Sequence, residues 1–312
     1  MKERKEYFMT VQNWVESLKQ IVRPQNIKLN EPLHVYTMTK LGGNADVFIT
    51  PSTEEEAIEV IRFAAKQNIS ILMLGNGSNM VVRDGGVRGI VLHFNLLNDI
   101  SIEDTTIVAQ AGALIKDVSK LAASKSLTGF EFACGIPGSI GGAMAMNAGA
   151  YGGEIKDVIV ECTIVTRDGD VMTLTKDELG LAYRKSIIAE KNYFVLNAKF
   201  ALQVGNQEEI DAKIADLTFQ RESKQPLEYP SAGSVFKRPP GHFAGKLIQD
   251  CGLQGKGIGG AEVSMKHAGF IINKNNATAT DYIGTIQMVQ KAVKEAYDIE
   301  LETEVKIVGD DQ

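Results

Sequence analysis

The sequence predicts an α+β fold divided into three parts, and three observations support this prediction. A strand, a helix, a second strand and a glycine loop follow one another between residues 47 and 79, an order typical of a βαβ unit. Short strands and turns then predominate up to residue 205, with few helices, which favours a mixed domain over an alternating doubly wound sheet. A polar segment at 205–209 precedes a compact set of helices and strands. We therefore expect domains at residues 1–79, 80–205 and 206–312.

The composition is that of an ordinary globular protein with an acidic surface. The chain has 312 residues, is 44% hydrophobic and carries a formal net charge of −6. Nucleic-acid and membrane-surface binding both favour a basic face, so the acidic balance argues against both. The N-terminal residues MKERKEYFMT lack the apolar core of a signal peptide, and no apolar run approaches the length of a membrane span. We therefore expect a cytoplasmic protein.

The cysteines and histidines indicate neither a disulfide framework nor a metal site. Cys134, Cys162 and Cys251 are odd in number and have no CxxC spacing. None of the four histidines has a companion at metal-ligand spacing. We expect the cysteines to be core thiols and expect no bound metal.

The first part of the chain is expected to hold a small sheet covered by helices. Residues 1 to about 30 have the apolar spacing of an amphipathic helix, and residues 34–39 alternate like a strand. A second strand at 47–50 leads to a helix that Ser52 or Thr53 caps, with Glu56 placed for a capping box.

The second part is expected to be rich in strands. A helix is indicated by the apolar spacing at 114–125, and Arg167-Asp168-Gly169-Asp170 is typical of a hairpin turn. The predicted strands lie at 90–93, 106–109, 158–166, 171–174 and 195–204.

The stretch at 134–150, CGIPGSIGGAMAMNAGA, is built almost wholly from small residues. Its glycines allow the backbone to approach a bulky anion, and Pro137 suits the first turn of a helix whose free N–H groups would face that anion. This pattern predicts a phosphate cradle, although a close-packed helix or turn would explain the same residues.

A second glycine loop, LGNGSN at 74–79, follows the apolar run 69–74, which is typical of a buried strand. Ligands commonly bind where such strands end. Neither a dinucleotide fingerprint nor a P-loop occurs with the required elements around it. Two loops that each offer backbone donors suit a ligand with a pyrophosphate in its middle, and a flavin dinucleotide fits this description better than a mononucleotide.

Five motifs, taken together and in this order, resemble those of the UDP-N-acetylenolpyruvoylglucosamine reductase family (MurB). They are LGNGSN at 74, GIPGSIGGA at 135, YRKS at 183, YPSAGSVFKRP at 229 and LETEV at 301. The resemblance covers nearly the whole chain and implies a cytoplasmic flavoenzyme of peptidoglycan synthesis. It implies an FAD-binding region of the vanillyl-alcohol-oxidase type in two subdomains, followed by a smaller substrate domain. NADPH would reduce FAD, and the enolpyruvyl ether of UDP-N-acetylglucosamine would become the lactyl ether of UDP-N-acetylmuramate.

The resemblance also implies three catalytic residues. Ser234 would protonate the carbanion with help from Lys237, and Arg184 and Glu304 in the last strand would meet the charge that spreads into the substrate carboxylate. Without the resemblance, the three catalytic residues have plainer explanations: a surface arginine at a strand end, a solvated strand face for the glutamate, and a serine that closes a turn.

Cofactor and substrate contacts are expected from the same motifs. Arg238 stands where other family members often carry asparagine, and no insertion between residues 193 and 205 supplies the extra tyrosine loop that some of them have. The expected substrate contacts are Arg221, Gln225, Lys237 and Arg238. The expected FAD contacts are Leu74, Gly75, Asn76, Gly77, Ser78, Asn79, Gly135, Ile136, Pro137, Gly138, Ser139, Gly141 and Gly142.

Two other functions are compatible with parts of this pattern. An oxidase or dehydrogenase of the same flavin-fold superfamily would share the glycine loops but would not need the YPSAGSVFKRP loop together with Glu304. A non-catalytic nucleotide-binding or interaction module would use the glycine loops only as turns. We expect the chain to be a monomer that binds NADPH and the enolpyruvyl sugar nucleotide, with no nucleic-acid or membrane partner.

Overall fold

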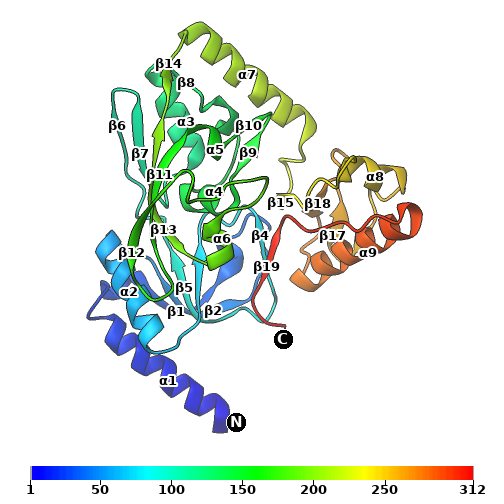
Figure 1. Cartoon of the computed structure of the whole chain (residues 1–312). Helices are drawn as coiled ribbons and strands as arrows, with labels where there is room; N and C mark the ends of the chain where they lie inside the picture. Colours follow the sequence, from blue (N-terminus) through cyan, green and yellow to red (C-terminus); the bar gives the residue numbers. More distant parts are fainter. Residues whose placement is uncertain (1, 312) are drawn as a thin grey trace. The chain divides into compact units, whose positions relative to one another are not determined.

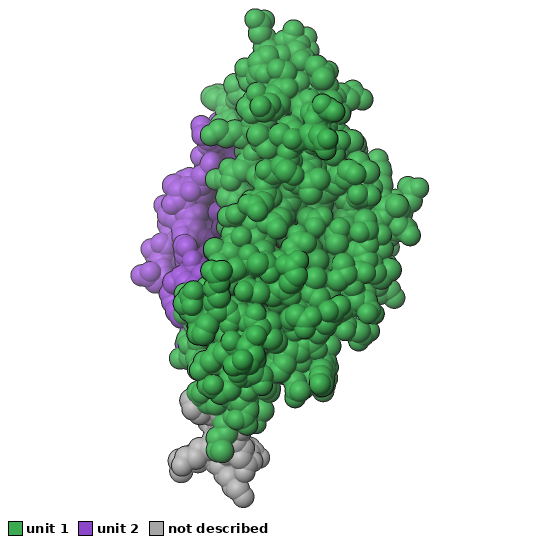
Figure 2. Space-filling view, turned by 90° about the vertical axis from the view of Figure 1, so that its left-hand side faces the viewer, with its two compact units in different colours: residues 1–31, 45–76, 88–219 green, residues 32–44, 77–87, 220–312 purple. Residues whose placement is uncertain are grey.

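The computed structural model describes residues 2–311, and its side chains are described from residue 9 onward. The chain folds into two compact units, which Figure 2 colours separately. Unit 1 comprises residues 1–31, 45–76 and 88–219, and unit 2 comprises residues 32–44, 77–87 and 220–312. The division into three domains at residues 79 and 205 stays a prediction.

Unit 1 contains a four-stranded and a five-stranded sheet and most of the helices (Figure 1). Its helices are α1 (Lys2–Leu18), α2 (Glu54–Lys66), α3 (Ile115–Ser124), α4 (Ile140–Met146), α5 (Ile155–Val158), α6 (Ile187–Lys191) and α7 (Gln207–Lys224), with 3-10 helices η1 (Pro24–Asn26) and η3 (Glu131–Ala133). The residues of α7 from Gln220 onward are assigned to unit 2. Its strands are β1 (Ile27–Pro32), β2 (Asn44–Ile49), β3 (Ile71–Leu74), β5 (Val87–His93), β6 (Ile100–Glu103), β7 (Thr106–Gln110), β8 (Leu127–Thr128), β9 (Gly149–Ala150), β10 (Gly153–Glu154), β11 (Ile159–Val165), β12 (Val171–Thr175), β13 (Phe194–Ala201) and β14 (Gln203–Val204).

The four-stranded sheet has the order β1-β2-β5-β3, so the predicted βαβ unit is present with β5 inserted between its two strands. The cap of α2 is confirmed: the Thr53 hydroxyl accepts a hydrogen bond from the Glu56 N–H at 3.2 Å, and the Glu56 carboxylate accepts one from the Ser52 N–H at 2.6 Å. Strands β3 and β5 run parallel, with Leu74 opposite His93. The carboxyl ends of both strands therefore meet at one edge of the sheet, where ligands commonly bind.

The five-stranded sheet has the order β12-β11-β13-β7-β6. Helices α3 and α4 pack against β7, and α4 also packs against β13. The predicted hairpin at 167–170 joins the antiparallel β11 and β12, and Gly169 takes the positive φ of 93° that its turn requires. One continuous hydrophobic core, which includes Ile49, Leu92 and Phe200, connects this sheet with the four-stranded one. The loops at the strand ends thus start from a rigid base.

Unit 2 is a small α+β body with its own core. Its elements are η2 (Leu33–Val35), β4 (Met80–Val82), β15 (Ser231–Ser234), α8 (Ala244–Asp250), β16 (Gly257–Ile258), β17 (Ala261–Val263), β18 (Phe270–Asn273), α9 (Ala279–Tyr297) and β19 (Lys306–Val308). Helix α9 packs on the sheet β15-β18-β17-β16, and its fully buried Tyr282 donates a hydrogen bond to the Ile271 carbonyl at 2.8 Å.

Two predictions for the first part of the chain were wrong. The helix expected up to about residue 30 ends at Leu18, and residues 27–32 form β1. Pro24 disfavours helical backbone at Arg23, so a helix that continued to residue 30 would be interrupted there. Residues 34–39 do not form a strand. Their turn is closed instead by the Thr37 hydroxyl, which donates to the Leu41 carbonyl at 2.9 Å and accepts from its N–H at 3.2 Å.

The α+β class itself is confirmed. The prediction of core thiols holds for Cys162, whose burial raises its pKa far above the ordinary thiol value, whereas Cys134 and Cys251 are only partly buried. None of the helices within residues 2–311 is both long and apolar enough to cross a membrane.

Candidate functional site

The two predicted glycine loops lie against each other at the end of β3. The Asn76 amide donates a hydrogen bond to the Pro137 carbonyl at 2.6 Å, across 61 positions of sequence. The approach is so close that a methyl group on Gly75 would lie 2.3 Å from the Ser139 hydroxyl oxygen. A larger residue at position 75 would have to displace the Ser139 hydroxyl, and the predicted close approach of this loop to an anionic ligand stays a prediction.

The second glycine loop is also fixed from the side of α3. The Ile115 N–H donates to the Gly138 carbonyl at 3.0 Å, and the Ile140 N–H donates to the Ala113 carbonyl at 2.8 Å. Helix α4 begins at Ile140, with Ser139 as its N-cap residue, so the prediction that Pro137 lies in its first turn was wrong. The Ser139 hydroxyl accepts a hydrogen bond from the Gly142 N–H at 3.4 Å. Serine is a preferred N-cap residue, which explains why the helix begins just after it.

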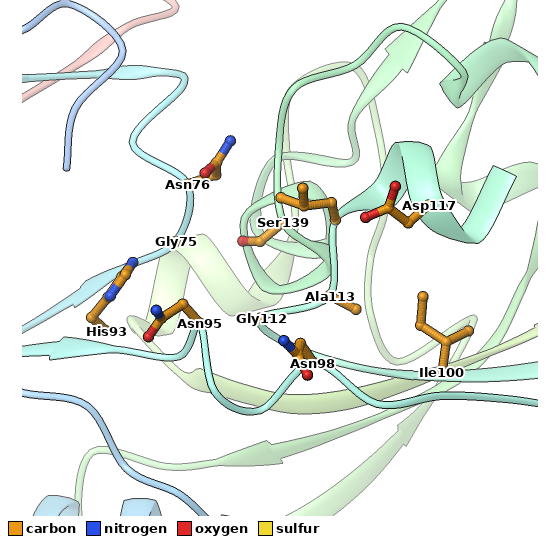
Figure 3. Close-up of a pocket in the computed structure, with 11 residues that line it drawn as sticks. Gly75, Asn76, His93, Asn95, Asn98, Ile100, Gly112, Ala113, Asp117 and Ser139 are labelled. Carbon is orange, nitrogen blue, oxygen red and sulfur yellow. The ribbon is translucent and has the colours of Figure 1, made fainter. Parts of the chain in front are cut away.

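A cavity of about 400 Å³ lies beside the two loops (Figure 3). This volume is in the range of roughly 300–1,000 Å³ that is usual for small-molecule and cofactor sites. Figure 3 shows His93, Asn95 and Asn76 on one side of it and Ser139 and Asp117 on the other. The lining residues are Gly75, Asn76, His93, Asn95, Asn98, Ile100, Gly112, Ala113, Leu114, Asp117 and Ser139.

Of these eleven lining residues, only Gly75, Asn76 and Ser139 were among the expected FAD contacts. The other eight were not predicted from the sequence. His93 and Asn95 stand at and just after the end of β5, and Gly112 follows the end of β7. Strand ends at a predicted sheet edge are themselves a signal for ligand residues, and this signal was available for both strands.

Among the residues that line the cavity, His93 has a strongly shifted pKa. Burial lowers the pKa of its imidazole from 6.5 to about 4, although a hydrogen bond with the Gly75 backbone acts in the opposite direction. His93 is 9% exposed and its ring lies 5.4 Å from the Phe48 ring. It is therefore neutral at physiological pH.

We expect the free energy of unfolding to fall as the pH drops from about 7 to about 4. In this range the unfolded chain takes up a proton on His93 but the folded chain does not, which costs up to about 3 kcal/mol. The measurement is urea unfolding of FAD-free protein at several pH values, with His93→Gln and, as a control, the exposed His34→Gln. The His93 variant should show the flatter pH profile, and equal slopes in all three proteins would contradict the assignment.

Arg184 lies in a tight turn of unit 1, not at a strand end. Ala182 and Lys185 exchange backbone hydrogen bonds of 3.2 and 3.0 Å around it, and Arg184 itself has φ of 54°, which is unusual for a residue other than glycine, asparagine or aspartate. Its guanidinium donates to the Gly149 carbonyl at 3.3 Å and lies 5.2 Å from the centre of the exposed Tyr183 ring.

In unit 2, a β-bulge turns Ser234 away from the core. Ser231 pairs with Ile272 and Ser234 with Phe270, so β15 has one residue more than β18 over this stretch, and Gly233 takes a φ of 74°. Strict alternation would place Ser234 on the same face as the buried Ala232. The extra residue reverses this, and Ser234 is exposed.

The backbone of Glu304 lies directly beside this strand. Its N–H donates to the Val235 carbonyl at 2.7 Å, and its carbonyl accepts from the Asn79 side chain at 3.1 Å. Glu304 is half-buried and precedes β19, so the prediction that it lies in the last strand was wrong. The structure nevertheless brings Ser234 and Glu304 to neighbouring positions of unit 2.

The expected FAD contacts divide between the two units. Leu74 to Asn76 and the whole second glycine loop belong to unit 1, whereas Gly77 to Asn79 belong to unit 2. A methyl group on Gly77 would lie 2.3 Å from the Tyr36 carbonyl oxygen, and the Asn79 side chain holds Glu304. A role in FAD binding stays a prediction for all of these residues, in both units.

The expected substrate residues all lie in unit 2. Lys237 forms an ion pair with Glu302, and the Arg238 guanidinium stacks 4.0 Å from the centre of the exposed Phe243 ring. Arg221 and Gln225 lie at the end of α7 and just beyond it. The Gln225 Oε1 atom is buried and has no hydrogen-bond partner among the described residues, which is the state of an acceptor that a ligand could satisfy.

Comparison with known proteins identifies both parts of the chain. Residues 45–175 match the family described as FAD binding domain, and residues 225–308 match the C-terminal domain of UDP-N-acetylenolpyruvoylglucosamine reductase. The FAD match contains both loops of the cavity.

Several similar proteins cover nearly the whole chain. UDP-N-acetylenolpyruvoylglucosamine reductase of Listeria monocytogenes is 60% identical over 92% of this chain and 96% of its own length. The enzyme of that name from Geobacillus thermodenitrificans is 57% identical over 95% of this chain and 97% of its own length. The crystal structure of UDP-N-acetylenolpyruvylglucosamine reductase (MurB) from Thermus caldophilus superposes with a TM-score of 0.76 at 33% identity, covering 91% of this chain and 98% of that one. With these identities across both units, the chain belongs to the UDP-N-acetylenolpyruvoylglucosamine reductase family.

Proposed function

We propose that this chain uses NADPH and FAD to reduce the enolpyruvyl ether of UDP-N-acetylglucosamine to UDP-N-acetylmuramate, a step of peptidoglycan precursor synthesis. The observation that carries the proposal is the position of Ser234 in unit 2. Its bulge exposes it, and the next residue, Val235, accepts a backbone hydrogen bond from the Glu304 N–H, so Ser234 and Glu304 lie close together. A flavin oxidase that acts on another small molecule would need the cavity of unit 1 but not this pair.

The residues around the cavity fit FAD. Two loops with glycines at close contacts would offer backbone N–H groups to a pyrophosphate, and the neighbouring amides of Asn76, Asn95 and Asn98 would donate and accept hydrogen bonds. Neutral His93 adds a polar group without a charge. Within this arrangement Leu74 to Asn76 and the loop from Gly135 to Gly142 would hold the cofactor.

Three residues take roles in the reaction. When bound, FAD would supply the hydride for the terminal carbon of the enolpyruvyl group, with NADPH as the source of the electrons. The Arg184 guanidinium and Glu304 meet the negative charge that spreads into the substrate carboxylate, Arg184 by direct attraction and Glu304 as an acid or by ordering its surroundings. The Ser234 hydroxyl donates the proton that completes the product, and the nearby cation Lys237 makes this hydroxyl a better acid.

The chain has a negative net charge, so we expect clustered cations to bind the diphosphate of the sugar nucleotide. Arg221 and Lys237 contact its diphosphate, and Gln225 offers an amide whose buried Oε1 would gain a donor on binding. Arg238 stands where other family members often carry asparagine, and its stacking on Phe243 orients the planar guanidinium, which could bind an anionic group. The protein acts as a monomer in the cytoplasm, where the NADPH it needs is available.

Anaerobic stopped-flow absorbance tests the proposal in two steps. The FAD-loaded protein is first mixed with NADPH and then with the enolpyruvyl sugar nucleotide. We expect the visible flavin absorbance to disappear in the first step and to return in the second. Return of absorbance only with oxygen would favour an oxidase, and protein that takes up no FAD would exclude every flavin-dependent function.

A further inference from the structure

Asn147 lies fully buried at the C-terminal end of α4, and both its side-chain nitrogen and its side-chain oxygen form hydrogen bonds. It takes a left-handed conformation with φ of 46°. Its Nδ2 group donates to Glu154 Oε2 at 2.7 Å and to the Ala182 carbonyl at 3.0 Å, and its Oδ1 accepts from the Lys156 N–H at 2.9 Å. Ala182 is the first residue of the turn that carries Arg184, so this one amide joins that turn to α4.

The turn is anchored to the same helix at its other end. The Ser186 hydroxyl donates to the Ala145 carbonyl at 2.5 Å, and the Arg184 guanidinium donates to the Gly149 carbonyl at 3.3 Å, two residues beyond Asn147. A positive φ is costly for arginine, and such a conformation persists only where the surrounding structure fixes it. The bonds from residues 145–149 supply that fixation.

We propose that Asn147 is a positioning residue for Arg184, a role that rests on the function proposed above for that arginine. Its side chain fixes the turn through Ala182, and the backbone just after it receives the guanidinium. The position of the guanidinium is therefore set by α4, the helix that also begins at the Ser139 end of the FAD cavity. A misplacement of about 1 Å is sufficient to weaken catalysis about a hundredfold, so such a link matters for the reaction.

Asparagine is suited to this position for two reasons. It tolerates the left-handed conformation, and its amide gives two donors and an acceptor at once. Glycine would keep the backbone but lose all three side-chain bonds. Aspartate would keep the acceptor for the Lys156 N–H but place a second carboxylate beside Glu154.

A double-mutant cycle with Arg184 tests the proposal. In FAD-loaded protein we expect Asn147→Gly to slow flavin reoxidation by the enolpyruvyl substrate about 10- to 100-fold, with little change in reduction by NADPH. In the Arg184→Ala background the same substitution should change reoxidation less than about twofold, since its target is gone. Asn68→Gly, another asparagine at a positive φ of 53° but exposed, is the matched control and should retain the wild-type rate.

The exchange variant Asn147→Asp/Glu154→Gln separates positioning from folding. It allows a hydrogen bond between residues 147 and 154 with donor and acceptor reversed. The Ala182 carbonyl then keeps only the bond from the Lys185 N–H and loses the one from residue 147. We expect its melting temperature to recover most of the loss of Asn147→Asp, while reoxidation stays slow. Recovery of the wild-type rate together with stability would overturn the proposal, and this variant decides the question if Asn147→Gly does not hold FAD.

The cycle also distinguishes failure of the inference from failure of the proposed function. If Arg184→Ala itself reoxidises at the wild-type rate, the role proposed for Arg184 is wrong. If Arg184→Ala is slow but Asn147→Gly slows it further by the same factor as in the wild type, Asn147 acts independently of Arg184 and only the inference is overturned.

Discussion

Replacing Ser234 with alanine is expected to slow reoxidation of the reduced flavin by the enolpyruvyl substrate by about 100- to 10,000-fold. The substitution removes the hydroxyl that donates the proton and leaves the cofactor cavity, which lies in unit 1, unchanged. Reduction by NADPH does not use this proton and should stay within about twofold of the wild-type rate. Anaerobic stopped-flow absorbance of the flavin measures both steps.

Ser231→Ala provides the matched control for this experiment. Ser231 lies in the same strand and pairs with Ile272, but it stands before the bulge that presents Ser234. Its variant should show wild-type rates in both steps. Equal losses in both steps of Ser234→Ala would mean that the substitution disturbs the protein generally, and an unchanged second step would remove Ser234 from the reaction.

The sequence was sufficient to locate two glycine loops that meet beside a cavity, because their signals are local. A glycine loop at the end of an apolar strand predicts a ligand site whatever the rest of the fold does, and Gly75 and Ser139 indeed lie together beside a cavity. The starting point of α4 was missed because two local signals compete there. Pro137 favours a first helical turn, but Ser139 is the better cap, and the helix begins after the serine.

Tertiary features decided the points that the sequence left open. Asn98 and Asp117 reach the cavity from segments that no local pattern connects with the glycine loops. The alternation in LETEV predicted a strand for Glu304, yet the backbone bond to Val235 holds this residue before β19 begins. The bond between Val235 and Glu304 joins residues about 70 positions apart. The periodicity of a local stretch carries no information about contacts between distant segments.

The residues proposed to be catalytic also combine local signals with tertiary contacts. For Ser234, Gly233 is a visible sign of a bulge, but only the pairing with β18 shows that the bulge reverses the face on which the serine lies. For Arg184, nothing in the YRKS motif indicates a left-handed conformation, which the bonds to α4 maintain. The resemblance to the family supplied the proposed roles of Ser234 and Arg184. The structure adds the contacts that hold their backbones, which are the pairing with β18 and the bonds to α4.

Replacing Gly75 with alanine is expected to weaken FAD binding about 10- to 100-fold. The added methyl group would lie 2.3 Å from the hydroxyl oxygen of Ser139, which is buried and caps α4. Relief of this contact either rotates the Ser139 hydroxyl away from its cap on α4 or moves one glycine loop away from the other, and overpacking of this kind costs about 1–3 kcal/mol. Titration of the FAD-free protein with FAD, followed by flavin fluorescence, measures the affinity. Gly245→Ala, at a helix position of unit 2 where the nearest atom is 3.4 Å away, should bind FAD normally.

A second substitution shows whether the contact itself is responsible. Ser139→Ala removes the clashing oxygen, and the remaining Ser139 Cβ lies 3.5 Å from the methyl position of residue 75, an ordinary contact. Alone, Ser139→Ala should weaken FAD binding because α4 loses its cap. In the Gly75→Ala background the same change should leave affinity unchanged or improve it, because it relieves the clash. Losses of affinity that simply add in the double variant would mean that the two loops do not meet at these residues when FAD is bound.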